Sequence, residues 1–152
     1  AEAVAYYKTQ GKTVFNVLAE VYQRFGFYKE ALISVTKKGK DGAEQIQQLM
    51  QQYRTNPPQE MNGSAVEMIY DVKNARISYP KTQKVEVLNL DKSNVMQFFL
   101  ADGSKISARP SGTEPKIKYY FSVNTNISNT ADYRATEKVL LDKLEALKKY
   151  FS

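Results

Sequence analysis

The sequence predicts an α+β fold in which helices pack on one face of an antiparallel sheet. Three observations support this fold class. The spacing of apolar residues changes from a period of 3.6 to a period of 2 at Ser64 and returns to 3.6 after Thr130. Asp102-Gly103 is a strong signal for a two-residue hairpin between two of the strands. Helices are therefore expected before and after a run of strands in the sequence.

Two helices are expected in the first 26 residues. The segment 1–7 has a helical pattern, and Gly11 ends this first helix. Thr13 is the candidate N-cap of the second helix, which Gly26 stops. The apolar residues of the second helix follow an i, i+3, i+4 spacing and are Val14, Val17, Leu18, Val21, Tyr22 and Phe25.

A strand and a third helix follow. Residues 27–36 are predicted to be extended, and the polar break at 37–40 marks a predicted domain boundary. The segment Asp41-Gly42-Ala43-Glu44 has the spacing of a capping box, with Asp in place of Ser or Thr. The prolines of Asn56-Pro57-Pro58 end the helix, because proline cannot donate a backbone hydrogen bond. The apolar stripe of this helix is Ile46, Leu49, Met50 and Tyr53.

Strands and a last helix fill the remainder of the chain. The first strand is expected to place Val66, Met68 and Tyr70 on one face. The next strands are predicted at 85–90, 95–101, 105–109 and 117–123, of which the last alternates most regularly. Thr130 is the candidate cap of the final helix, whose apolar face holds Leu140, Leu144, Leu147 and Phe151.

The composition excludes several kinds of chemistry. The chain of 152 residues is 42% hydrophobic and 25% charged, as in an ordinary globular domain. It has no Cys and no His, which excludes a Ser-His-Asp triad, a His general base and a thiolate or imidazole zinc site. No apolar run approaches the roughly 20 residues of a membrane span, and no signal segment opens the chain. These observations predict a cytoplasmic protein with no membrane partner.

The balance of charge points to an anionic ligand. The chain has 22 Lys and Arg against 16 Asp and Glu, a net charge of +6. A positive field attracts anions, which include nucleic acids and phosphorylated small molecules. No run of Lys and Arg forms a nucleic-acid-binding tail, so the position of the charge matters more than its sum.

The segment from Arg109 to Lys118 between the last two strands has the composition of an anion site. Arg109 has a planar guanidinium group that can bind a phosphate through two hydrogen bonds. Ser111 and Thr113 bring two hydroxyl groups, and Gly112 between them lets the backbone approach an oxyanion or adopt a positive φ. Four basic residues lie in or beside the segment against the single acid Glu114, and they are Lys105, Arg109, Lys116 and Lys118.

A second interpretation is that Pro110-Ser111-Gly112-Thr113-Glu114-Pro115 is an inert turn, because Pro, Ser and Gly are the usual turn residues. Glu114 counts against a phosphate, since a carboxylate repels it. The residue could point away, pair with Arg109 or Lys116, or accept a hydrogen bond from a sugar hydroxyl, and the sequence leaves these roles open.

The ten residues Arg109-Pro110-Ser111-Gly112-Thr113-Glu114-Pro115-Lys116-Ile117-Lys118 resemble the phosphate-binding loop of the α-D-phosphohexomutases, the family of phosphoglucomutase and phosphomannomutase. In that family the loop belongs to the fourth, C-terminal domain. The stretches at 6–13 and 38–42 are also similar to the family, at the end of the third domain and the entry to the fourth. The resemblance implies a four-stranded antiparallel sheet with flanking helices, of the TATA-binding-protein-like class.

The resemblance also implies a domain division and a function. Residues 1–38 would be a remnant of the third mutase domain, and residues 39–152 would be the C-terminal domain. The mutase transfers a phosphoryl group between a phosphoserine and a hexose phosphate, and the loop holds the phosphate that is not transferred. Carried over by position, the residues that bind this phosphate are Arg109, Ser111, Gly112, Thr113 and Lys118, with Lys116 a weaker candidate.

Much of the family's machinery is missing from the sequence. The phosphoserine loop, the Asp-rich magnesium loop and the sugar-reading loop are absent, and Ala1 is not preceded by Met. The chain is therefore expected to be a C-terminal fragment with no catalytic residue, no metal ligand and no cofactor of its own. Magnesium is implied only for the full-length isomerase. The expected partners are a hexose phosphate, with glucose or mannose undecided, and the missing N-terminal domains.

Two further function classes follow from the same residues. A basic antiparallel sheet rich in Tyr could stack the bases of a nucleic acid, although Ile117, Tyr119 and Phe121 share a face that the helices are expected to cover. A structural or interaction domain would leave the turn at 109–116 inert. The mutase interpretation predicts no nucleic-acid partner. It also predicts an exposed apolar face in residues 1–36, whose partners would lie in the third domain.

Overall fold

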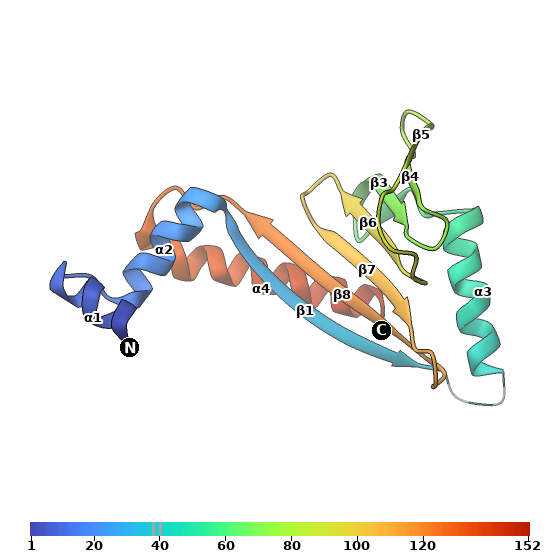
Figure 1. The fold of residues 1–152 in the computed structure, drawn as a ribbon, viewed down its shortest axis with the longest axis horizontal. Helices are drawn as coiled ribbons and strands as arrows, with labels where there is room; N and C mark the ends of the chain where they lie inside the picture. Colours follow the sequence, from blue (N-terminus) through green and yellow to red (C-terminus); the bar gives the residue numbers. More distant parts are fainter. Residues whose placement is uncertain (38, 40) are drawn as a thin grey trace.

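The structure is a computed structural model that describes residues 1–37, 39 and 41–152. The predicted α+β fold class is confirmed (Figure 1). The helices are α1 (Glu2–Thr9), α2 (Val14–Phe25), α3 (Gly42–Thr55) and α4 (Tyr133–Tyr150), with a short 3-10 helix η1 (Thr130–Asp132) before α4. The strands are β1 (Phe27–Thr36), β2 (Glu60–Met61), β3 (Ser64–Asp71), β4 (Arg76–Tyr79), β5 (Lys84–Val87), β6 (Met96–Leu100), β7 (Lys105–Pro110) and β8 (Lys116–Thr125).

The sheet is wider than the four strands expected from the resemblance. Its order is β1-β8-β7-β6-β3-β4-β5, and the short β2 pairs with β3. All of these pairings are antiparallel. Four central strands, β8, β7, β6 and β3, are extended by β1 on one side and by the β4–β5 hairpin on the other.

One face of the sheet carries the core. Alternate residues of β8 are buried, as predicted for this strand, and Ile117, Tyr119 and Phe121 are at most 3% exposed. Helix α4 contacts β1 and β8, and α3 contacts β7 and β8. The predicted stripes fill this interface, since Ile46 and Met50 of α3 are buried. The buried residues of α4 are Leu140, Leu144 and Leu147.

The N-terminal helices project beyond one end of the sheet (Figure 1). No residue of α1 is buried, and Ala19 is the buried residue of α2. Phe15 and Phe25 are 77% and 64% exposed, as expected for helices whose apolar partners lie elsewhere. Tyr22 differs from that prediction, because its ring stacks on Phe27 with 4.2 Å between the centroids.

β1 joins the same sheet as the later strands. It pairs with β8 over ten residues, from Phe27 opposite Thr125 to Thr36 opposite Lys116. An ion pair of 2.5 Å between Lys29 and Glu137 also holds β1 to α4. The predicted boundary at 38/39 falls on Lys38, which lies outside the described residues, and the division into 1–38 and 39–152 stays a prediction.

Several local predictions about the helix ends need correction. Thr13 caps α2 in a capping box with Asn16, as predicted. Asp41 precedes α3, but its side chain makes no capping hydrogen bond. Thr130 lies inside η1, and the side chain of Asn129 accepts the capping hydrogen bond from Ala131 N.

The strands also differ in detail from the sequence pattern. A register shift between Val66 and Met68 buries Val66 but moves Met68 and Tyr70 away from the core face, so the predicted common face is wrong. The β6–β7 turn has three residues instead of two, because Leu100 N donates to Ser104 O and Gly103 adopts φ +80°.

Two elements were not predicted, and one is shorter than predicted. β4 was missed, and so was the β2–β3 hairpin, in which Met61 pairs with Ser64 around Asn62-Gly63. The strand predicted at 85–90 is β5, which ends at Val87 because Leu88 N donates to Ala75 O. Within the described ranges, no helix is long and apolar enough to cross a bilayer.

Candidate functional site

The predicted anion-binding segment is the connection between β7 and β8, which we call the 109–118 loop. Its last two strand pairs are Arg109 with Lys118 and Pro110 with Ile117. Ser111 N then donates to Lys116 O at 2.9 Å, which closes the hairpin. The two ends of the loop are therefore fixed by the sheet, and only its tip is irregular.

Arg109 and Lys118 lie side by side on the open face of the sheet. Their strand neighbours Ala108, Ile117 and Tyr119 are buried under the helices, and successive residues of a strand point to opposite faces. Arg109 is exposed, and Lys118 is half-buried.

This juxtaposition leaves positive charge without a counter-charge. Within the described parts of the chain, neither Arg109 nor Lys118 has a carboxylate within ion-pair distance. Like charges directly opposite on neighbouring strands repel each other. An anion held between the two side chains would relieve this repulsion.

The tip of the loop supplies neutral donors. The Ser111 hydroxyl oxygen accepts a long hydrogen bond of 3.5 Å from Thr113 N, and both Gly112 and Thr113 are exposed. Gly112 does not have a positive φ, and a methyl group there would meet no described atom within 4 Å. The conformation of the backbone therefore does not require glycine at this position.

Glu114 pairs with Lys116, which is one of the three roles that the sequence left open. Their side chains form an ion pair at the tip of the loop. The hydrogen bond from Lys116, together with the charges of Lys116 and Lys118, lowers the pKa of Glu114 below its usual value. Lys116 is thereby paired, whereas Arg109 and Lys118 form no ion pair with a described residue.

β1 braces the loop from the side. Lys37 N donates to Pro115 O at 2.9 Å, and Thr36 is paired with Lys116. Ser34 lies opposite Lys118 on the open face. These contacts were not predicted, because residues 1–38 were assigned to another domain and no local pattern reveals a pairing across some 80 residues.

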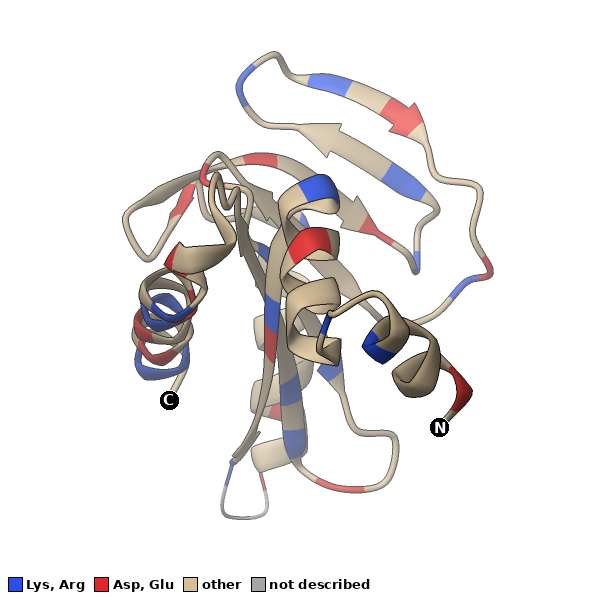
Figure 2. Ribbon diagram, turned by 90° about the vertical axis from the view of Figure 1, so that its left-hand side faces the viewer, with Lys and Arg blue, Asp and Glu red and all other residues tan. Residues whose placement is uncertain are grey.

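Elsewhere in the described residues the charges are mixed. Lys and Arg are interspersed with Asp and Glu over the helices and strands (Figure 2). Tyr119 and Phe121 are buried under α4, where Phe151 packs on both rings, so they offer no stacking surface to a base. In the described ranges, no group of three or more acidic side chains gathers in a way that could hold a metal ion.

Comparison with known proteins identifies the family. No protein-family model matches the chain. Over 116 residues, or 76% of the chain, it is 38% identical to the phosphoglucomutases of Staphylococcus aureus strains N315, Mu50 and MSSA476. The chain belongs to the phosphohexomutase family.

This family member spans 21% of the length of those Staphylococcus aureus relatives. Phosphohexomutases are isomerases that transfer a phosphoryl group, and this chain corresponds to a part of such an enzyme. Among solved structures, the chain matches pp63/parafusin, a phosphoglucomutase from Paramecium, in its open form. The TM-score is 0.44 with 19% identity, over 93% of this chain and 24% of that chain.

Proposed function

We propose that this chain is the phosphate-binding domain of a phosphoglucomutase, and that the 109–118 loop holds the phosphate of a hexose phosphate that is not being transferred. The observation that carries the proposal is the Arg109–Lys118 pair, two like charges side by side with no described carboxylate partner. Family membership supports the reaction class, and the name of the Staphylococcus aureus relatives favours glucose phosphate as the substrate.

Each proposed residue has a distinct role. Arg109 can donate two parallel N–H bonds to a phosphate, and Lys118 adds a compact charge from the neighbouring strand. Ser111 and Thr113 can donate from their hydroxyl groups. Gly112 leaves room for the phosphate against the backbone. Glu114 is paired with Lys116, which offsets its repulsion of the anion.

The loop contributes position and no bond-making step. Fixing the remote phosphate of the substrate orients the sugar oxygen that reacts, and binding energy used in this way lowers the barrier of the reaction. A site that binds the phosphate and does not contact the sugar ring can accept either end of a hexose bisphosphate. This property suits an enzyme that must turn its intermediate around.

The phosphoserine, the metal and the sugar-binding groups would belong to the rest of the enzyme. The described residues do not fit a magnesium ion, because no cluster of three acidic side chains is present among them. The other domains of the same enzyme are the proposed partner of this chain. Exposed apolar side chains on α2, such as Phe15 and Phe25, offer them a contact surface.

Titration of the ¹⁵N-labelled chain with glucose 1-phosphate tests the proposal. We expect amide shifts centred on residues 109–118. The affinity should be weak, with a Kd of about 1 mM or higher, because the exposed loop covers a ligand from one side only. Arg109→Ala should remove most of the response, and Lys148→Ala on α4 should leave it unchanged. Shifts at 109–118 that are absent, or that survive Arg109→Ala, would overturn the proposal.

A turnover assay tests the assignment of the chemistry to other domains. The chain alone, given magnesium, glucose 1-phosphate and a hexose bisphosphate activator, should form no glucose 6-phosphate. Sustained turnover that co-purifies with the chain and is lost in Arg109→Ala would show that this chain carries catalytic residues of its own.

A further inference from the structure

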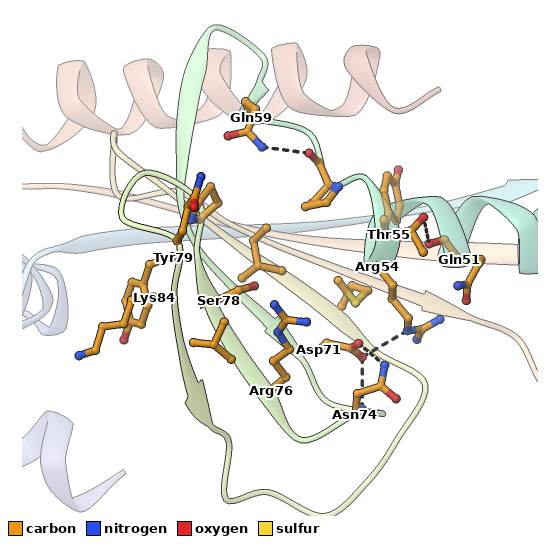
Figure 3. A pocket seen from close by; sticks show the side chains of 17 residues that line it. Gln51, Arg54, Thr55, Gln59, Asp71, Asn74, Arg76, Ser78, Tyr79 and Lys84 are labelled. Atoms are coloured by element: carbon orange, nitrogen blue, oxygen red, sulfur yellow. Dashed lines mark hydrogen bonds and ion pairs between the residues drawn. The ribbon is translucent and has the colours of Figure 1, made fainter.

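A polar cleft of about 560 Å³ lies beyond the edge of α3, over the β3–β4–β5 part of the sheet (Figure 3). Its volume is within the range of small-molecule sites. The side chains that matter most are Arg54, Asp71, Asn74, Arg76 and Ser78. None of them belongs to the 109–118 loop or to the proposed phosphate site.

The base of the cleft is a fixed guanidinium group. Arg54 Nε donates to Asp71 Oδ1 at 3.2 Å, and the two side chains are only 9% and 10% exposed. Arg54 Nη2 donates to Asn94 at 2.5 Å and Nη1 to the Met50 carbonyl at 3.3 Å. Arg54 is therefore held in place by three hydrogen bonds, and its charge is balanced by that of Asp71.

The wall of the cleft carries a charge without a partner. Arg76 opens β4, is exposed, and among the described residues has no carboxylate within ion-pair distance. Figure 3 shows its guanidinium between Ser78 and Asp71. Asp71 is already engaged by Arg54 and by the Asn74 amide, which donates to Asp71 Oδ2 at 2.5 Å. The three charged groups Arg54, Asp71 and Arg76 therefore sum to one positive charge.

The other cation at the rim is already neutralised. Lys84 pairs with Glu86, and Glu86 also accepts a hydrogen bond from the Tyr79 hydroxyl at 3.0 Å. The carbonyl end of α3 lies near this end of the cleft and disfavours an anion, but Arg54 stands in the last turn of the helix and offsets that field. Neutral hydrogen-bonding groups such as Gln51, Thr55 and Gln59 also line the cleft, together with apolar residues such as Ile69, Val85 and Met96.

We propose that this cleft binds a small hydroxylated oxyanion, a sugar-sized phosphate or carboxylate. The oxyanion would bind Arg76, whose exposed guanidinium can donate two parallel N–H bonds to it. Arg54 lies beyond Asp71 in Figure 3 and balances the charge of that carboxylate. The amides and hydroxyls around the oxyanion suit the hydroxyl groups of the ligand. This site is separate from the 109–118 loop, because Arg76, Asp71 and Ala108 lie on the helix-covered side of the sheet and Arg109 lies on the other.

Three probes with one carbon skeleton test the proposal on the ¹⁵N-labelled chain: glucose 6-phosphate, gluconate and uncharged glucose. Either or both anions should shift the amides of residues 54–59 and 74–79, and which of them does so identifies phosphate or carboxylate as the preferred group. Glucose should give no shift there. If no anion shifts these amides, or if glucose does so equally, the proposal is wrong.

Substitution of Arg76 separates this site from the loop. Arg76 is exposed, so Arg76→Gln should keep the fold while weakening the anion response at 54–59 and 74–79 about tenfold or more. Shifts at 109–118 should persist in Arg76→Gln, and shifts at the cleft should persist in Arg109→Gln. The two proposals are therefore tested independently, and one can be wrong while the other is supported. A cleft response that is unchanged in Arg76→Gln would overturn the proposal.

Discussion

Removing one charge of the Arg109–Lys118 pair is expected to stabilise the ligand-free chain while weakening its response to phosphate. The two residues are direct cross-strand partners on the open face of the sheet. Like charges at that spacing cost about 0.2–1 kcal/mol. Arg109→Gln should therefore raise the free energy of unfolding by about 0.2–1 kcal/mol at low ionic strength, where the repulsion is least screened.

Phosphate should stabilise the two proteins to different extents. With a Kd of about 1 mM, 10 mM phosphate adds about 1.4 kcal/mol to the free energy of unfolding, since a ligand stabilises by RT ln(1 + [L]/Kd). In a chain of this length each kcal/mol moves the Tm by about 2–4 °C. The Tm of the unaltered chain should therefore rise by about 3–6 °C in phosphate, and that of Arg109→Gln should rise by much less.

Thermal unfolding in phosphate and in chloride of equal ionic strength measures both effects. Lys149→Gln is the matched control, because Lys149 is exposed on α4 and forms no ion pair with a described residue. It removes the same charge and should keep the full phosphate response. The reasoning is refuted if Arg109→Gln unfolds at a lower temperature than the unaltered chain and still gains stability from phosphate.

Three further predictions follow from single residues. Gly112→Ala should change the free energy of unfolding by less than about 1 kcal/mol, because its methyl group meets no described atom, but it should weaken phosphate binding in a titration. Asp71→Ala should cost about 3–5 kcal/mol in urea unfolding, because it leaves the buried Arg54 guanidinium unpaired, and a loss under 1 kcal/mol would contradict this. Lys116→Met should raise the pKa of Glu114 towards the usual value of a glutamate, which an NMR titration measures. Because the ion pair lowers this pKa in the folded chain, it stabilises the fold at pH values above the usual glutamate pKa, and this stabilisation is lost as the pH falls through the lowered pKa.

The parts of the fold that could be predicted are those with a strong local signal. The alternation of Ile117, Tyr119 and Phe121 identified β8, and the stripe of α4 identified its buried face. The connection at 109–118 could also be located from the sequence, because turn residues there separate two predicted strands, and its role in binding phosphate stays a prediction. The positions of its residues in the hairpin follow from the strands on either side.

Other features depend on contacts between distant segments or on signals that were not used. The pairing of β1 with β8 places Thr36 opposite Lys116, and the sequence around either residue contains no signal for this pairing. The bulge in β3 moves Met68 to the other face, which an unbroken alternation does not foresee. Asn62-Gly63, in contrast, is a strong hairpin signal, and both residues adopt the positive φ that a type I′ turn requires.

The cleft could not be predicted from the sequence for a similar reason. Arg54 and Asp71 are 17 residues apart on a helix and a strand. In the sequence, each of them is indistinguishable from an ordinary charged surface residue. Only the packing of α3 against the sheet buries them together and leaves Arg76 facing the space beside them (Figure 3). Sites built across elements in this way require the tertiary structure.

A crystal structure of the chain soaked with glucose 1-phosphate tests the central claim most directly. The account predicts the phosphate at the 109–118 loop, with its oxygens bound by the Arg109 guanidinium, the Lys118 ammonium and the hydroxyls of Ser111 and Thr113. A loop that stays empty while Arg109 turns away to pair with a carboxylate would contradict it.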